Sequence, residues 1–122
     1  MKVKKSYAGL GLFTESGIER KGFVIEYVGP ILTEKQANKR AGKYLFETSK
    51  NRFIDGTFRT NIARYANHSC RPNAEIDIAK GRVYLFAKRG ILPGEEILYN
   101  YGSEYFNEHI KPFGCRCLKC KK

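Results

Sequence analysis

Long hydrophobic runs are absent from this sequence of 122 residues. No apolar stretch approaches the roughly 20 residues that a membrane-spanning helix needs. The basic start, Met1–Lys5, is not followed by the apolar core of a secretory signal peptide. We therefore expect a soluble intracellular protein, cytoplasmic or nuclear, with no membrane partner.

Proline is scarce, at four residues, whereas glycine is frequent, at 12. This balance argues against a disordered or collagen-like chain and is typical of short strands joined by tight turns. The sequence contains no internal repeat and no low-complexity linker. With 42% hydrophobic residues, it predicts a single folding unit with a modest core.

Acidic side chains are also few. Lys and Arg total 23 against 12 Asp and Glu, which gives a formal net charge of +11. Such a surface attracts nucleic acid, acidic lipid or an acidic protein face. The basic residues are scattered along the chain, so a merely solubilising surface is the alternative interpretation. Nucleic acid is a candidate partner, bound directly or indirectly.

Short strands dominate the expected secondary structure. Alternation and β-branched residues predict strands at 3–6, 23–28, 43–48, 52–54, 74–79, 82–88 and 96–101. A hairpin across Lys80-Gly81 should turn four side chains inward, namely Ile76, Ile78, Val83 and Leu85. Thr33 to Gln36 has the capping-box pattern of a short helix that Gly42 would end. Single helical turns are expected at 61–65 and 103–109.

Two glycines frame the segment Gly9-Leu10-Gly11. Glycine lets the backbone turn tightly and approach a neighbour closely. The segment lacks the third glycine and the following helix of a dinucleotide-binding fingerprint. A hairpin turn is therefore the simpler interpretation.

Residues 64–73 read Arg-Tyr-Ala-Asn-His-Ser-Cys-Arg-Pro-Asn. They combine hydrogen-bond donors, acceptors, one soft metal ligand and a proline that stops a helix. An ordinary polar loop has a similar composition. His68 has the ordinary pKa, near ~6.5, of a general base, but no nucleophilic Ser or Cys triad is evident.

The four cysteines have two interpretations. Cys115, Cys117 and Cys120 form a tight cluster, and Cys70 lies far from it in sequence. Two disulfides would suit a small secreted domain. The absence of a signal peptide and the tight spacing favour a metal site.

Four separated motifs occur in one order: Gly9-Leu10-Gly11, Tyr27-Val28-Gly29, residues 64–73, and Gly94-Glu95-Glu96-Ile97-Leu98-Tyr99-Asn100-Tyr101. Together, from about Val3 to Cys120, they resemble a SET-domain protein-lysine methyltransferase. The resemblance implies a mostly β fold, a β-clip of several short sheets with few short helices. In its knot-like C-terminal core, the Asn-His-Ser-Cys segment threads through a loop formed by the last motif. It also implies a minimal stand-alone SET domain, residues 1–102, joined to a zinc-binding post-SET tail, residues 103–122, as one structural unit.

The same resemblance implies two cofactors, S-adenosylmethionine and Zn²⁺. S-adenosylmethionine would be held by Gly9, Leu10, Gly11, Tyr65, Asn67, His68, Tyr101, Phe113 and Leu118, with the His68 backbone at the adenine. Tetrahedral zinc takes four ligands, here Cys70, Cys115, Cys117 and Cys120, so the tail must fold back onto residues 64–73. The implied catalytic residues are Tyr101, Tyr44 and Tyr99. The implied target-lysine channel is lined by Tyr44, Tyr99 and Tyr105.

Methyl transfer from a sulfonium to an amine is an in-line displacement, so positioning and desolvation supply most of the acceleration. A free lysine has a pKa near ~10.4. An apolar channel of tyrosine rings would favour its neutral, nucleophilic form. The hydroxyl of Tyr99 should crowd the channel and favour mono- or dimethylation.

The implied partner is a protein segment with a target lysine, such as a histone tail or another basic sequence. A chain of charge +11 should repel such a segment. Three solutions are open: an acidic groove from Glu26, Glu47, Asp55 and Glu104, a bridging nucleic acid, or a substrate other than a histone. The sequence gives no oligomeric state.

Two features depart from the commonest family pattern. Asn100 stands where an aspartate is usual, and the Cys-x-Cys-x-x-Cys tail is shorter than the frequent spacing. The alternative function is a non-catalytic, zinc-stabilised module that binds protein or nucleic acid.

Overall fold

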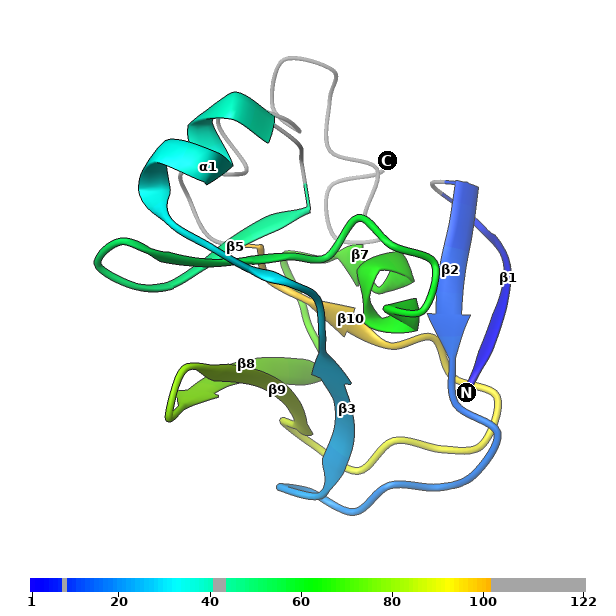
Figure 1. Ribbon diagram of the computed structural model, residues 1–122. Helices are drawn as coiled ribbons and strands as arrows, with labels where there is room; N and C mark the ends of the chain where they lie inside the picture. The colour runs from blue at the N-terminus through cyan, green and yellow to red at the C-terminus, as the bar shows by residue number, and fades with distance from the viewer. Residues whose placement is uncertain (8, 41–43, 102–122) are drawn as a thin grey trace.

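The computed structural model describes residues 1–7, 9–40 and 44–101. Its strands are short: β1 (Lys2–Ser6), β2 (Gly9–Phe13), β3 (Phe23–Tyr27), β4 (Ile31–Leu32), β5 (Leu45–Ser49), β6 (Arg52–Asp55), β7 (Asn67–His68), β8 (Ala74–Ala79), β9 (Arg82–Ala87) and β10 (Leu98–Tyr99). The helical elements of these ranges are α1 (Glu34–Arg40) and a 3₁₀ turn, η1 (Ile62–Tyr65). The expected mostly β fold of several small sheets is confirmed (Figure 1).

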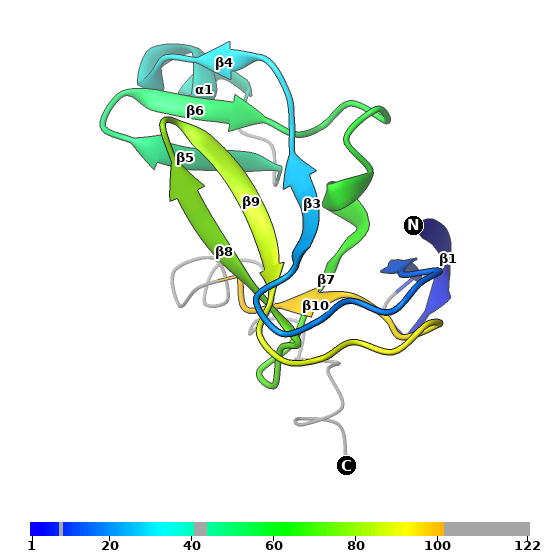
Figure 2. The same cartoon turned by 90° about the horizontal axis from the view of Figure 1, so that it is seen from below.

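The strands of the described ranges pair as four small sheets, in the orders β1-β2, β4-β6-β5, β3-β9-β8 and β10-β7. Figure 2 shows β9 between β3 and β8, with the β4-β6-β5 sheet and α1 at one end of that sheet and β1-β2 apart from it. None of the helices in these ranges is long and apolar enough to cross a membrane.

The helix α1 begins where local sequence predicts it. The backbone N–H of Thr33 donates to Gln36 Oε1 at 2.8 Å, and the N–H of Gln36 donates to Thr33 Oγ1 at 3.2 Å. These reciprocal bonds are the expected capping box. Ala37 is buried, so one face of the helix packs inward. The expected stop at Gly42 lies outside the described residues, as does the helical turn expected at 103–109.

The hairpin β8–β9 also follows local sequence. Lys80 and Gly81 have φ angles of 52° and 76°, the left-handed pair that a two-residue hairpin turn requires. Val83 and Leu85 are buried as expected. The expectation for Ile78 is wrong, because its side chain is 41% exposed. Ile78 lies opposite the buried Val83 but on the outer strand β8, whereas Val83 lies on β9, which has a paired strand on each side.

The two glycines lie in strand β2 rather than in a turn. β2 pairs antiparallel with β1, with Ser6 opposite Gly9, so the chain has reversed by the time it reaches Gly9. Gly9 has φ +101°, a conformation that other residues rarely adopt. The expected hairpin is therefore present, and Gly9 and Gly11 lie in its second strand.

The core has two clusters of buried apolar side chains. The larger comprises Leu12, Val24, Ala66, Ala74, Leu85, Ala87, Ile91, Ile97 and Tyr99; the smaller comprises Tyr27, Ile54, Ala63 and Val83. The larger cluster takes residues from both motif segments, 64–73 and 94–101. Burial of this core therefore holds the two motifs together.

Candidate active site

The two most specific motifs lie side by side. β7 and β10 pair as parallel strands, with Asn67 opposite Leu98 and His68 opposite Tyr99, near the centre of Figure 1. The N–H of Ser69 continues the pairing by donating to the carbonyl of Tyr99 at 3.1 Å. Residues 64–73 are therefore not an ordinary surface loop. The strand expected at 96–101 is confirmed only in its middle, as the two residues of β10.

The side chain of Asn73 also joins the two motif segments where residues 64–73 cross residues 94–101, a place that we call the crossing. Its Nδ2 donates to the carbonyl of Glu96 at 2.7 Å, and its Oδ1 accepts from the N–H of Leu98 at 2.9 Å. Its own N–H donates to the carbonyl of Leu98 at 3.1 Å. Asn73 is only 3% exposed. Its side chain therefore satisfies backbone groups at the start of β10 in the way that a neighbouring strand would.

Three predicted site residues form one ring cluster. The ring centroids of Tyr99 and Tyr101 lie 4.8 Å apart, and those of His68 and Tyr101 lie 5.3 Å apart. Tyr99 is buried, and Tyr101 is half-buried. The hydroxyl of Tyr101 donates to the carbonyl of Ala66 at 2.6 Å. Both tyrosines are thus held by packing at the point where the two motifs meet.

His68 is buried and held at several atoms. Its Nδ1 accepts from the N–H of Tyr101 at 3.1 Å, and its Nε2 lies 3.5 Å from the Sγ of Cys70. Burial lowers the pKa of His68 below its ordinary value, because desolvation disfavours the charged form. The Nδ1 lone pair is already used, so the ring does not suit a general base. The carbonyl of His68 accepts from the hydroxyl of Tyr7 at 2.6 Å, a partner that the sequence did not suggest.

Asn67 links β7 to the glycine segment. Its Nδ2 donates to the carbonyl of Leu10 at 2.9 Å and to Oε2 of Glu96 at 2.9 Å. The amide nitrogen therefore faces protein acceptors, and the amide oxygen is the atom suited to bind a ligand donor. The structure therefore places Asn67 directly beside the Gly9 to Gly11 segment.

Glu96 joins three segments of the candidate site, a role that the sequence did not indicate. Its two carboxylate oxygens lie 2.8 and 2.7 Å from the hydroxyl of Ser6, and one of them accepts from Asn67. A Cβ on Gly11 would lie 2.4 Å from Oε2 of Glu96. Gly11 is therefore needed to admit this carboxylate. The sequence offered only a weak signal, an acidic residue directly before the apolar pair Ile97-Leu98.

The other glycine of the segment has a different role. A Cβ on Gly9 would meet nothing within 4 Å, so its positive φ, rather than crowding, selects glycine. Leu10 next to it is 50% exposed. The backbone of Gly9 and Leu10 is accordingly accessible beside Asn67.

Tyr44 and Tyr65 are linked through Arg64. The guanidinium carbon of Arg64 lies 5.3 Å from the ring centroid of Tyr44 and 4.7 Å from that of Tyr65. Arg64 also donates to the hydroxyl of Tyr65 at 2.7 Å. The carbonyl of Tyr44 accepts from the hydroxyl of Tyr27 at 2.7 Å, so its backbone is fixed as well.

Cys70 lies beside a pocket of about 730 Å³. Its lining comprises Tyr7, Ser69, Cys70, Arg71, Pro72, Asn73, Lys88, Arg89, Glu95, Glu96 and Leu98. Arg89 donates to both oxygens of Glu95, at 3.0 and 3.2 Å, and this hydrogen bonding is the main reason that the pKa of Glu95 lies below its ordinary value.

Several predicted residues lie outside the described ranges. They are the zinc candidates Cys115, Cys117 and Cys120, the cofactor candidates Phe113 and Leu118, the channel candidate Tyr105, and Glu104 of the expected acidic groove. Within residues 1–7, 9–40 and 44–101, no three His, Cys, Asp or Glu side chains gather as a metal site.

One part of the expected acidic groove is wrong. Asp55 is 1% exposed, and its Oδ1 accepts from the backbone and the hydroxyl of Thr57. It therefore caps a turn and cannot present a charge to a substrate. Glu47 is exposed on β5, and Glu26 lies on β3.

Comparison with known proteins identifies a family whose sequence pattern this chain matches. The SET domain profile matches residues 9–102. The chain is 37% identical over 133 aligned residues to the histone-lysine N-methyltransferase trr of Drosophila melanogaster, covering 98% of this chain and 6% of that protein. It is 35% identical over 131 residues to the histone-lysine N-methyltransferase ASHH3 of Arabidopsis thaliana, covering 93% of this chain and 36% of that protein.

A third relative is the histone-lysine N-methyltransferase, H3 lysine-36 specific, of Chaetomium globosum. It is 32% identical over 131 residues, with coverage of 97% of this chain and 15% of that protein. The chain thus spans only a minor part of the length of each of these relatives.

Proposed function

This chain belongs to the SET domain family, and we propose that it is a protein-lysine N-methyltransferase that uses S-adenosylmethionine. We further propose that its substrate is a lysine in a histone or in another basic protein segment. The names of three similar proteins, all histone-lysine N-methyltransferases, support this proposal.

The observation that carries the proposal is the convergence of the motifs. Asn67 and His68 lie on β7, Tyr99 lies on the paired strand β10 with Tyr101 two residues beyond, and the glycine segment is tied to Asn67 through Leu10. A structural module has no need for this grouping of a neutral imidazole, two packed tyrosine rings and an accessible glycine backbone.

The residues present fit S-adenosylmethionine. Its ammonium group needs an acceptor, and the orientation of Asn67 leaves the amide oxygen for that purpose. The open space beside Gly9 admits a ligand against the backbone. When bound, the cofactor supplies a methyl group on a sulfonium.

In the proposed mechanism, tyrosine side chains position and desolvate the target amine. The hydroxyl of Tyr101 gives its hydrogen to Ala66 at 2.6 Å, so toward the amine it acts as an acceptor. An acceptor aligns an amine N–H and aims the nitrogen lone pair away from itself. The rings of Tyr99 and Tyr101 exclude water from one wall of the site, which favours the uncharged amine.

We propose that residues 1–102 form the SET domain and that residues 103–122 form a post-SET tail. Its three cysteines would join Cys70 around one Zn²⁺. The donor set fits, because four thiolates satisfy tetrahedral zinc. Cys70 lies two residues after His68 and 3.5 Å from its ring, so the ion would bind next to the predicted cofactor residues.

Removal of zinc is expected to destabilise the protein. A chelator without reductant should lower the thermal midpoint and release about one zinc per chain, because structural zinc contributes directly to folding free energy. Differential scanning fluorimetry and metal analysis check this. Cys70→Ser should bind less zinc and respond less to the chelator. An unchanged midpoint, with two disulfides found by mass spectrometry, would favour the disulfide alternative.

Tyr99→Phe is expected to raise the methylation state of the product. Tyr99 is 8% exposed, and its ring lies 4.8 Å from that of Tyr101, so loss of the hydroxyl makes room beside the proposed methyl acceptor. We expect products to shift from mono- and dimethyl-lysine toward trimethyl-lysine in mass spectrometry of a reacted peptide. Total incorporation of labelled methyl serves as the control for activity. An unchanged product distribution contradicts this assignment of Tyr99.

The proposed function itself is tested by methyl transfer from labelled S-adenosylmethionine to purified core histones. Label should appear on lysine side chains, identified by peptide mass spectrometry. Absence of transfer to histones and to a library of other basic proteins, despite bound cofactor, would support the non-catalytic module instead.

A further inference from the structure

The sheet β3-β9-β8 has one face turned away from the core. Along β9, Val83, Leu85 and Ala87 are buried, whereas Tyr84 and Phe86 between them are half-buried. Successive side chains of a strand point to opposite faces. Tyr84 and Phe86 therefore belong to the outward face.

Aromatic rings gather on this outward face. Phe23 on β3 pairs with Phe86 on β9 and is 58% exposed. Its ring centroid lies 6.4 Å from that of Tyr84 and 6.1 Å from that of Phe86, both in edge-to-face arrangements. An exposed aromatic cluster on an otherwise polar surface is typical of a binding site.

Carboxylates flank the rings on the same face. On β8, Glu75 lies opposite Phe86 and Asp77 opposite Tyr84, and both acids are exposed. On β3, Glu26 lies opposite Tyr84. We call these six residues the outer aromatic face: Phe23, Glu26, Glu75, Asp77, Tyr84 and Phe86.

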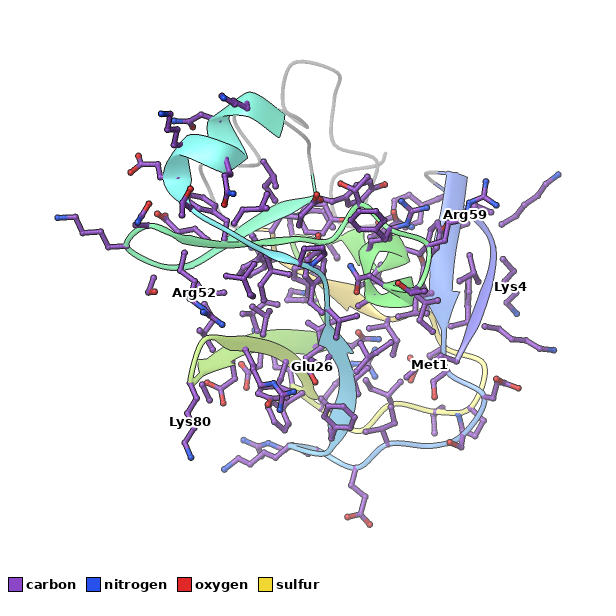
Figure 3. All side chains as sticks on the ribbon, in the orientation of Figure 1. Met1, Lys4, Glu26, Arg52, Arg59 and Lys80 are labelled. Carbon is purple, nitrogen blue, oxygen red and sulfur yellow. The ribbon has the colours of Figure 1, made fainter. Side chains whose placement is uncertain are left out.

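The charge of this face runs against that of the chain. The protein carries +11 overall, yet the outer aromatic face contributes three carboxylates. Arg82 lies on the same side of β9 as Tyr84 and Phe86, and its Nε lies 3.4 Å from Oε2 of Glu26. Arg82 therefore offsets one carboxylate, and Glu75 and Asp77 on β8 keep this side of the sheet net acidic. Figure 3 shows Glu26 on β3 and, at the β8–β9 turn, Lys80 extending away into solvent. The basic residues Lys4 and Arg59 lie on the side of β1 and β2 in the same view.

We infer that the outer aromatic face is a docking site for a lysine- and arginine-rich protein segment outside the methyl-transfer site. Ammonium and guanidinium groups bind to aromatic ring faces and pair with carboxylates. A face with both aromatic rings and carboxylates is complementary to a basic protein segment. Its carboxylates would repel nucleic acid and acidic lipid. This inference rests on the proposed function in one respect, that the docked segment belongs to the substrate protein.

Such a site resolves the expected repulsion between a basic enzyme and a basic substrate. Complementary charge at a docking surface raises the rate of encounter and suppresses wrong partners. A substrate held at a second point also presents its target lysine at a raised effective concentration. The face would thus serve as the acidic surface that a basic substrate needs. Of the four residues suggested for an acidic groove from the sequence, the face includes only Glu26.

The test uses a labelled peptide of alternating arginine and alanine, which contains no lysine and cannot be methylated. Its binding to the full chain is measured by fluorescence anisotropy at low salt, with a glutamate–alanine peptide as the negative probe. Glu75→Lys/Asp77→Lys should weaken binding by about tenfold or more, because two attractions become repulsions. Phe23→Ser should weaken it by about threefold or more through loss of a ring and no change in charge.

The control is Glu34→Lys on α1, the reversal of one exposed charge outside the face (Figure 2), which should change affinity by less than about twofold. Equal weakening by Glu34→Lys would overturn the inference in favour of a general charge effect. A dimer in analytical ultracentrifugation that Glu75→Lys dissolves would overturn it in favour of a second copy of the chain. Circular dichroism of each variant confirms folding.

A second readout separates this inference from the proposed function. The double variant should lower kcat/KM for full-length histone H3 but not for a short peptide carrying the same target lysine. Peptide binding without any methyl transfer would contradict the proposed function and support the docking site. Methyl transfer in which the double variant loses kcat/KM equally on both substrates would contradict the docking site and support the proposed function.

Discussion

Tyr101→Phe is expected to reduce methyl transfer by about 10²–10³-fold, the loss typical when one positioned hydrogen-bonding group is removed from an active site. The hydroxyl of Tyr101 is fixed by its 2.6 Å bond to the carbonyl of Ala66. Phenylalanine keeps the ring against Tyr99 and His68 but has no acceptor for an amine N–H. The fold should therefore survive while the turnover falls.

The measurement is transfer of labelled methyl from S-adenosylmethionine to core histones under single-turnover conditions. Binding of the cofactor, followed by calorimetry, should change far less than the rate. Tyr84→Phe is the matched control, because its ring lies on the outward face of the β3-β9-β8 sheet, and it should retain activity on a short peptide. Full activity of Tyr101→Phe would contradict the catalytic assignment of this residue.

Local sequence signals predicted the local structure well. The capping box at Thr33 and Gln36 and the hairpin turn at Lys80 and Gly81 depend on neighbours within four residues, and both are confirmed. The strands β3, β5, β6, β8 and β9 lie within the expected ranges to within two residues. Ile78 was misplaced, because alternation gives the face of a residue but not where the core ends.

Long-range structure was less accessible to local reasoning. β7 and β10 have two residues each and exist only because they pair with each other across about thirty residues of chain. Glu96 was missed for the same reason, since its partners Ser6 and Asn67 lie in distant segments. The family resemblance carried information on this crossing that periodicity cannot carry. The glycines themselves indicated a close approach to the backbone, and at Gly11 the structure shows one, by the carboxylate of Glu96.

For the candidate site, too, some features were expected from the sequence and others were not. The family resemblance implied that Asn67, His68, Tyr99 and Tyr101 belong to one site, and the structure brings them together. The sequence did not indicate that the His68 ring accepts from the Tyr101 N–H or that the Tyr7 hydroxyl binds the His68 carbonyl. Such contacts depend on side-chain placement across two crossing segments, which spacing alone does not fix.

Asn73→Ala is expected to lower the free energy of unfolding by about 2–5 kcal/mol, because it leaves two partly buried backbone groups without their partners. The N–H of Leu98 loses Oδ1, and the carbonyl of Glu96 loses Nδ2. Because Asn73 is only 3% exposed, water replaces these two hydrogen bonds poorly. Urea unfolding followed by circular dichroism measures the change.

Asn61→Ala provides the matched control. Asn61 is equally buried, and it accepts from the N–H of Val28 at 3.0 Å and donates to the carbonyl of Gly56 at 3.1 Å. We expect a similar loss of stability from it, since the chemistry is the same. Only Asn73→Ala should also weaken S-adenosylmethionine binding in the folded fraction, because Asn73 holds β10 against the strand that carries Asn67 and His68. Equal cofactor affinity in the two variants, or a loss in Asn73→Ala below about 1 kcal/mol, would show that the crossing is held by its apolar core rather than by this side chain.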